Sequence, residues 1–170
     1  MKIFLNPGHG GIDPGAIGPA GNYERDINAR IAAAAAERLK AAGHKVVLYQ
    51  QQRKLADVTV KANKSKADLF VSIHCNAAAN TDARGTETWY YTGCPHGKAA
   101  AEAIQSEVVK ALGSRDRGVK SSKSLYVLRK TVMPAVLCEV AFISNPEEEK
   151  LILVNIEKIG EAIADGIISR

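Results

Sequence analysis

The amino-acid sequence predicts an α/β fold, a single layered domain built on a mostly parallel sheet. Short apolar runs rich in branched residues alternate along the chain with longer segments of helical period. The length of 170 residues suits one compact domain. The sequence shows no internal repeat, low-complexity segment or linker, so we expect residues 1–170 to form one domain.

The first strand is predicted at residues 2–5, and the first helix at residues 23–42, after a glycine-rich loop. Asn22 is the candidate N-cap of this helix, and Gly43 ends it. Apolar residues recur along it at every fourth position, namely Ile27, Ile31, Ala35 and Leu39. This spacing predicts an amphipathic helix with one buried stripe.

The middle of the chain is expected to hold three further strands and two further helices. The strands are predicted at residues 45–49, 68–74 and 85–91, the last because it is rich in β-branched and aromatic residues. The helices are predicted at residues 55–66, where the polar face is rich in lysine, and at residues 98–112.

The C-terminal part contains the most apolar predicted strand, residues 134–142, followed by a helical region. Asn145 is a candidate N-cap, Pro146 suits the first turn, and Glu148 occupies the capping-box position. The buried stripe of the helical region is expected to consist of four isoleucines, Ile156, Ile159, Ile163 and Ile167.

The composition is that of a soluble globular chain, with 46% hydrophobic and 24% charged residues. The formal net charge of +5 favours an anionic partner, such as a teichoic acid-bearing wall, a nucleic acid or an acidic peptide. A nucleic acid is not expected, because the sequence has neither an RNA-binding aromatic motif nor a basic helical stripe. The apolar run before Asn6 and Pro7 is only three residues long, so we expect no signal peptide, no membrane anchor and synthesis in the cytoplasm.

The three cysteines are Cys75, Cys94 and Cys138. Their odd number and the absence of a Cys-x-x-Cys spacing argue against a disulfide framework and against a cysteine zinc site. We expect Cys75 and Cys138 to be small buried hydrophobic residues without a nucleophilic role.

Unusual polar residues lie at three predicted strand ends, where ligands of open α/β sheets collect. His9 follows the first strand, His74 ends the third, and Glu139 lies near the end of the most apolar strand. Glu24 adds a carboxylate in the first turn of the first helix. If the strands are parallel neighbours, the four side chains converge on one cleft. Two imidazoles and one carboxylate, with an open fourth position, form a known catalytic zinc set.

Each of these residues also has a purely structural interpretation. His9, in a glycine-rich turn, would suit anion binding with neighbouring backbone N–H groups. Glu24 would be favourable at a helix N-terminus through the helix dipole alone. His74 would be a hydrogen-bonded core histidine, and Glu139 a paired buried acid, since a buried carboxylate is costly without a partner.

Four unusual segments occur in a fixed order. They are residues 9–18 (HGGIDPGAIG), 72–77 (SIHCNA), 85–88 (GTET) and 139–145 (EVAFISN). Together they resemble the N-acetylmuramoyl-L-alanine amidases of the type 3 family, and the likeness runs almost from end to end. The resemblance implies a six-stranded sheet flanked by helices. It also implies that residues 1–170 are an amidase catalytic domain without a separate cell-wall-binding domain.

The resemblance further implies that His9, Glu24 and His74 hold zinc and that Glu139 is the catalytic glutamate. The implied reaction is hydrolysis of the amide bond between N-acetylmuramic acid and L-alanine in bacterial peptidoglycan, as in autolysins and endolysins. Zinc would activate a water molecule, and Glu139 would act as general base and then as general acid. Asn76 and Arg129 are candidates for contact with the substrate.

Peptidoglycan is therefore the expected partner, the cell wall the expected place of action, and a monomer the favoured state. One alternative is a zinc peptidase that cuts within the peptide stem, because the same residues suit any amide. A second alternative is a non-catalytic wall-binding module, which the positive charge would favour.

Overall fold

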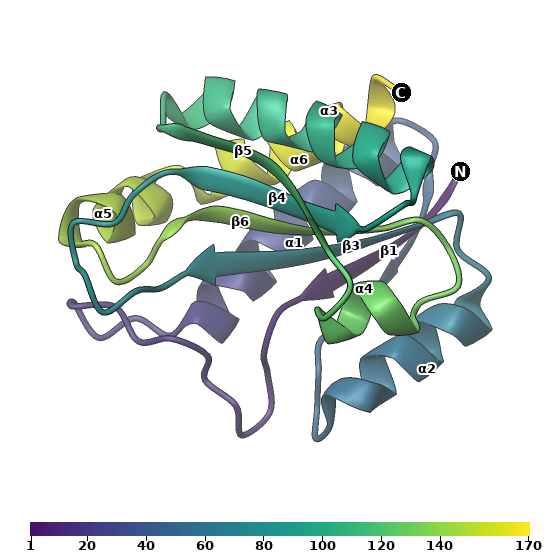
Figure 1. The fold of residues 1–170 in the computed structure, drawn as a ribbon, viewed down its shortest axis with the longest axis horizontal. Helices are drawn as coiled ribbons and strands as arrows, with labels where there is room; N and C mark the ends of the chain where they lie inside the picture. Colours follow the sequence, from purple (N-terminus) through teal and green to yellow (C-terminus); the bar gives the residue numbers. More distant parts are fainter.

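Six strands form one sheet, and helices cover both of its faces (Figure 1). The computed structural model describes residues 1–170. The strands are β1 (Lys2–Pro7), β2 (Lys45–Leu48), β3 (Leu69–Asn76), β4 (Thr86–Tyr91), β5 (Asp116–Ser122) and β6 (Ala135–Phe142). The helices are α1 (Glu24–Ala41), α2 (Leu55–Ser65), α3 (Pro95–Leu112), α4 (Tyr126–Lys130), α5 (Pro146–Val154) and α6 (Ile156–Ile168).

The strand order is β2-β1-β3-β6-β4-β5, and most neighbours are parallel. Strands β2, β1, β3 and β6 run in one direction, whereas β4 is antiparallel to β6 and β5 is parallel to β4. The predicted α/β fold with a mostly parallel six-stranded sheet is thus confirmed. The carboxyl ends of β1, β3 and β6 meet at one edge of the sheet, which is where ligands bind in such folds.

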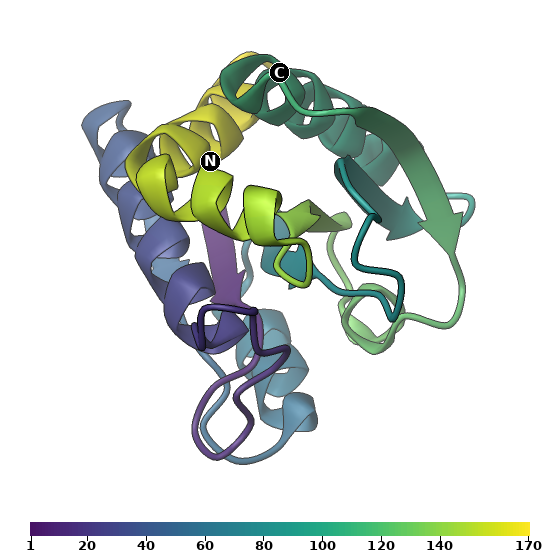
Figure 2. The same cartoon turned by 90° about the vertical axis from the view of Figure 1, so that its left-hand side faces the viewer.

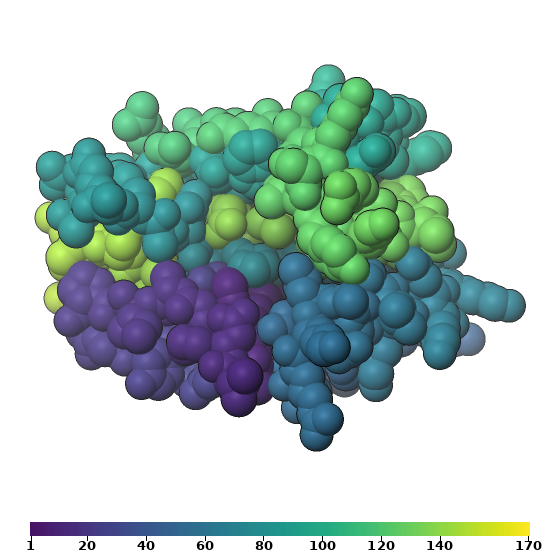
Figure 3. Space-filling model, turned by 60° about the horizontal axis from the view of Figure 1, so that its bottom comes forward, coloured from purple at the N-terminus to yellow at the C-terminus, as the bar shows by residue number.

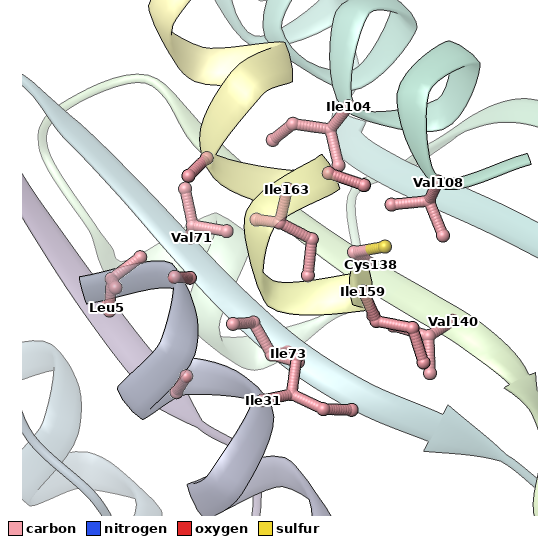
Figure 4. Close-up of a cluster of buried hydrophobic side chains, with 14 of the residues drawn as sticks. Leu5, Ile31, Val71, Ile73, Ile104, Val108, Cys138, Val140, Ile159 and Ile163 are labelled. Carbon is pink, nitrogen blue, oxygen red and sulfur yellow. The ribbon is translucent and has the colours of Figure 1, made fainter. Parts of the chain in front are cut away.

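The larger hydrophobic core lies on the face covered by α1, α3 and α6. Figure 4 shows Leu5, Val71 and Ile73 of the sheet meeting Ile31 of α1 and Ile163 of α6. Figure 2, turned by 90°, shows α6 in yellow between α1 and α3. The four isoleucines predicted as a buried stripe all belong to this core, which confirms the amphipathic pattern of the C-terminal region.

The opposite face carries a smaller core under α2 and α4. Phe4 and Phe70 stack there with ring centroids 5.6 Å apart. Side chains alternate between the faces of a strand, so His74 lies on the same face as Phe70, and Glu139 on the same face as Leu137. Two short helices cover this face only in part, and the polar residues toward the strand ends stay accessible from it.

Two elements, β5 and α4, were not predicted from the sequence. Strand β5 contains a single apolar residue, Val119, because it is an edge strand. Helix α4 has only five residues, too few to show a helical period. The C-terminal helical region is also divided, since α5 ends and α6 begins at Asn155.

The predicted N-cap of α1 is wrong. Tyr23 occupies the N-cap position without a side-chain cap, and the Asn22 side chain instead donates a hydrogen bond to Glu149. At α5 the predicted N-cap is confirmed, because the Asn145 side chain accepts hydrogen bonds from the N–H groups of Glu147 and Glu148. The predicted capping box is wrong, since the Glu148 carboxylate instead accepts hydrogen bonds from the N–H groups of Gly85 and Phe142.

The cysteines are free, and Cys75 and Cys138 are buried as predicted. The Cys94 side chain caps α3 by accepting a hydrogen bond from the Gly97 N–H. None of the helices has both the length and the apolar character needed to cross a membrane.

Candidate active site

Three side chains from separate elements meet at the carboxyl edge of the sheet. His9 comes from the loop after β1, Glu24 from the first turn of α1, and His74 from β3. One potential ligand atom from each residue lies within 4.8 Å of the other two. The carboxylate bridges the histidines, because Glu24 Oε2 is 3.1 Å from His9 Nε2 and Glu24 Oε1 is 3.0 Å from His74 Nδ1.

The backbone of the loop after β1 is shaped around this cluster. His9 has a φ of 62°, a left-handed conformation that costs about 1–3 kcal/mol for a residue other than glycine and is typical of functional sites. A Cβ atom on Gly8 would overlap the His74 ring. A Cβ on Gly15 would lie 2.6 Å from Glu24 Oε2 and 2.7 Å from the His9 ring. The loop therefore approaches the cluster so closely that only glycine fits at these two positions.

A second layer of hydrogen bonds orients the cluster. Asp13 Oδ2 lies 2.9 Å from His9 Nδ1, and an Nδ1–H that donates to Asp13 orients the ring so that Nε2 faces Glu24. The Glu24 carboxylate accepts hydrogen bonds from the N–H groups of Ala16 (2.9 Å) and Cys75 (3.2 Å). The Asn28 side chain adds a third donor at 3.3 Å. The orientation of Glu24 is therefore fixed from three directions.

The cluster holds opposite charges close together. Burial would raise the pKa of Glu24, but hydrogen bonds from His74 and His9 outweigh it and hold this pKa well below its usual range. The hydrogen bond to Glu24 raises the pKa of His9 to about 9, against the opposing effect of burial, and Asp13 acts in the same direction as Glu24. The ionised Glu24 carboxylate thus holds a proton on the neighbouring His9 imidazole, and a metal cation bound between these residues would displace that proton.

Glu139 lies on β6, directly opposite His74 of β3 and opposite Glu87 of β4. Its Oε2 atom is the only buried side-chain nitrogen or oxygen without a hydrogen-bond partner. Burial raises the pKa of Glu139 to about 7, Glu24 and Glu87 push it the same way, and His74 opposes them. Because an unpartnered buried oxygen is costly, this carboxylate calls for a functional explanation.

A cleft of about 250 Å³ opens beside the histidines. It is lined by His9, Asp13, Gln51, Leu55, His74, Leu125, Tyr126, Val127 and Leu137. In Figure 3 the segments that border it meet on one face, with the N-terminal loop in purple, α2 in blue and the region around α4 in green. A larger groove of about 790 Å³ lies between β2 and α2, but it contains no histidine and only one acidic residue, Asp57. The smaller cleft is therefore the candidate active site, because it is the one lined by the two histidines.

Comparison with known proteins shows the family to which the chain belongs. The family model described as N-acetylmuramoyl-L-alanine amidase matches residues 3–169. The chain belongs to the N-acetylmuramoyl-L-alanine amidase family. The predicted resemblance is thus confirmed over nearly the whole chain.

Individual members of the amidase family are similar in sequence and fold. The N-acetylmuramoyl-L-alanine amidase LytC of Bacillus subtilis (strain 168) is 39% identical over 174 residues, which cover 98% of this chain and 35% of LytC. An endolysin of Bacillus phage SPP1 is 36% identical over 179 residues, 97% of this chain and 64% of the endolysin. The crystal structure of an amidase from Clostridium difficile 630 has a TM-score of 0.93 at 36% identity and covers 99% of this chain and 95% of that chain. The chain thus spans about a third of the length of LytC.

The structure brings His9, Glu24 and His74 together and sets Glu139 on the neighbouring strand, opposite His74. The roles of these residues in an amidase remain predictions. Asn76 lies at the end of β3, where its side chain donates to Glu87 Oε1 at 3.2 Å.

Arg129 is exposed on α4, the helix that also supplies Tyr126 and Val127 to the cleft. The substrate contacts of Asn76 and Arg129 stay predictions.

Sequence reasoning missed two acids near the cluster, Asp13 and Glu87. Asp13 follows His9 by four residues in the glycine-rich loop, and this spacing was a usable signal. Glu87 is a buried acid in a strand of β-branched and aromatic residues. An acid in such a strand is unusual, because burying an unpaired carboxylate is costly.

Proposed function

We propose that this chain is a zinc-dependent amidase that hydrolyses the bond between N-acetylmuramic acid and L-alanine in bacterial peptidoglycan. The observation that carries the proposal is the cluster of His9, Glu24 and His74 beside the unpartnered carboxylate oxygen of Glu139. Membership of the amidase family supports the choice of substrate. The place of action would accordingly be the cell wall.

The donor set fits zinc. Two imidazole nitrogens and one carboxylate oxygen are the ligands of many catalytic zinc sites, in which a fourth position stays open for water or substrate. The hydrogen bond between His9 and Asp13 matches the carboxylate–histidine support common behind zinc ligands. His9 and His74 also line the cleft, so a substrate has access to the metal position. When bound, zinc polarises the scissile carbonyl and lowers the pKa of a coordinated water to about 7.

Glu139 would move the proton in this reaction. Its carboxylate takes a proton from the attacking water as the oxygen bonds to the carbonyl carbon, and delivers it to the amide nitrogen as the C–N bond breaks. The products are a free carboxyl group on the muramic acid and a free amino group on L-alanine. Burial raises the pKa of Glu139 to about 7, and a bound cation would oppose this rise. A raised pKa favours both steps, because the same group must accept and donate a proton near neutral pH.

Asn76, at the end of β3, and Arg129, on α4, would contact the substrate. The Asn76 side chain is oriented by Glu87 and by the Ala77 N–H, which leaves one of its N–H donors for a ligand. The exposed Arg129 side chain has no ion pair within the chain, so its charge is available to an anionic polymer.

Digestion of purified peptidoglycan, with and without a chelator, tests the proposed function. We expect new L-alanine amino termini and loss of activity with chelator, restored by zinc. New termini within the peptide stem would instead indicate a peptidase. Binding to the wall without cleavage, unaffected by chelator, would indicate a non-catalytic module and contradict the proposal.

A further inference from the structure

A row of charged side chains continues from the metal cluster across the sheet. His74 of β3 faces Glu139 of β6, which in turn faces Glu87 of β4. Beyond Glu87, the edge strand β5 contributes two cations to the same carboxylate oxygen. Arg117 Nε lies 2.7 Å and Lys120 Nζ 2.6 Å from Glu87 Oε2.

A β-bulge in β5 brings both cations to one face. Thr86 pairs with Asp116, but Thr88 pairs with Val119, so β5 contains one extra residue opposite Glu87. Without the bulge, residues 117 and 120 would point to opposite faces, because they are an odd number of positions apart. Gly118, with a φ of 78°, supplies the left-handed backbone within this segment. The bulge thus brings two cations, Arg117 and Lys120, to one acid, Glu87.

The group formed by Glu87, Arg117 and Lys120 has an excess positive charge and unused hydrogen-bond donors. Burial would raise the pKa of Glu87, but hydrogen bonds from Arg117 and Lys120 hold it below its usual range, so the acid is ionised and balances only one of the two cations. Its other oxygen is occupied by hydrogen bonds from Asn76 and Trp89.

The cations themselves have capacity left for a ligand. Arg117 uses Nε and Nη1 within the protein, which leaves Nη2 free, and Lys120 uses one of its three N–H groups. Their side chains are 29% and 33% exposed, whereas that of Glu87 is 7% exposed. The cations are accessible and the acid that holds them is not.

The proposed proton transfer orients the substrate relative to this cluster. If Glu139 protonates the leaving nitrogen, the peptide stem lies on the Glu139 side of His74, toward β4 and β5. Neighbouring strands are about 4.8 Å apart, and an extended peptide covers about 3.3–3.6 Å per residue. Glu87 is one strand from Glu139 and two strands from His74, so the cations gathered on it lie roughly one to three stem residues beyond the scissile bond.

We propose that Arg117 and Lys120, held in place by Glu87, form a subsite for a carboxylate of the peptide stem, that of its second residue. This inference rests on the proposed amidase function. A carboxylate at this position neutralises the excess positive charge and accepts charge-assisted hydrogen bonds from Arg117 Nη2 and the Lys120 ammonium group. Hydrolysis is then selective for stems with a free acid at the second residue.

Two soluble muramoyl peptides test the subsite, identical except that the α-carboxyl group of the second stem residue is free in one and amidated in the other. For the zinc-loaded protein we expect kcat/KM to be roughly 10- to 100-fold higher for the free acid, the usual range for a hydrogen bond to a charged group. Lys120→Gln and Arg117→Gln should each bring this ratio closer to one. Lys123→Gln is the matched control, because Lys123 is exposed and has no ion pair, and its ratio should equal that of the unaltered protein.

A ratio near one for the unaltered protein overturns the subsite while the amidase function stands. The subsite is equally overturned if the preference persists undiminished in both variants. If Arg117→Gln does not fold, the unaltered protein and Lys120→Gln still decide the question. If the zinc-loaded protein cleaves neither peptide before L-alanine, the proposed function fails and the subsite with it.

Discussion

At the scale of single residues, the surroundings of two neighbouring carboxylates shift their pKa values in opposite directions. Glu24 is buried but is held ionised by hydrogen bonds from two histidines and the backbone. Glu139 is half-buried, its Oε2 atom is buried without a partner, and its pKa rises to about 7. Pairs of acids whose pKa values are driven apart commonly divide the work of a site. Glu24 is suited to binding a cation, and Glu139 to transferring protons.

Replacing each acid by glutamine separates these two roles. Glu139→Gln should retain zinc and lose roughly two to four orders of magnitude of turnover, the usual contribution of a positioned general base. Glu24→Gln should lower zinc affinity, because it removes the negative ligand. The measurements are zinc content and turnover of the folded variants. A zinc-loaded Glu139→Gln protein with unchanged turnover would rule out the proton-transfer role.

The thiols should be dispensable for catalysis, since metal-assisted hydrolysis needs no nucleophilic side chain. Burial raises the pKa of Cys138 to about 12, and burial also raises that of Cys75, so both thiols stay protonated. A variant with Cys75→Ala, Cys94→Ala and Cys138→Ala should keep most of its activity per folded molecule, despite some loss of stability. Turnover is compared at equal zinc content, and its abolition would contradict this expectation.

At the scale of elements, the glycine-rich loop between β1 and α1 does most to position the site. It supplies His9 in a left-handed conformation and passes so close to His74 and Glu24 that side chains at Gly8 and Gly15 would collide with them. The loop is fixed by hydrogen bonds such as that from the Gly8 N–H to the Ile73 carbonyl, at 2.8 Å. Its conformation and the metal cluster therefore depend on each other.

Gly8→Ala tests this dependence. The added methyl group would overlap the His74 ring, so His74 must move, and zinc affinity should fall by about 10- to 100-fold, as for other changes behind metal ligands. Gly21→Ala in the same loop is the control for backbone strain without a collision, because Gly21 has a φ of 85° but its Cβ would meet no atom within 4 Å. Zinc titration should give a lower zinc affinity for Gly8→Ala than for Gly21→Ala. Equal zinc affinities would show that the close approach at Gly8 is unimportant.

Strands and helices with a clear apolar pattern were predictable from the sequence, and irregular ones were not. The apolar runs of β3 and β6 and the stripe of α1 mark those elements plainly. Strand β5 escaped prediction because its bulge breaks the alternation of side chains and its edge position requires few apolar residues.

The same division holds within the site. His9, His74 and Glu139 could be found because charged residues are unusual at the ends of apolar strands. The contacts of Arg117 and Lys120 with Glu87 join residues 30 and 33 positions apart and depend on the bulge. No local pattern in the sequence reports a pairing of that kind.

At the scale of the whole molecule, the positive charge is concentrated beside the cleft. Residues 115–130 contain six basic residues and one acidic residue, a net charge of +5. The rest of the chain then has 17 basic residues (23 minus 6) and 17 acidic residues (18 minus 1), so it is neutral and the segment accounts for the whole formal charge. This segment forms β5 and α4, and α4 borders the cleft.

Activity on intact wall should therefore depend on ionic strength. Raising the salt concentration screens exposed charges, so turnover of insoluble wall should fall more steeply than turnover of a small uncharged soluble substrate. A double variant, Arg115→Gln with Lys130→Gln, should flatten this dependence. The control is Lys45→Gln with Lys150→Gln, which removes the same charge from exposed positions outside the segment. Identical salt profiles for both variants would refute a local effect of the segment.

The reversed direction of β4 relative to β6 has a consequence for how members of such a family diversify. Because β4 runs against β6, residues 77–85 leave the functional end of β3 and return to the same end of the sheet, past the end of β6 (Figure 1). Most residues of this loop are exposed, and none belongs to either hydrophobic core. A loop of this kind tolerates insertions and deletions, since its length is not tied to the packing beneath it. New contacts for different cell walls could be acquired there while the metal cluster and the sheet remain unaltered.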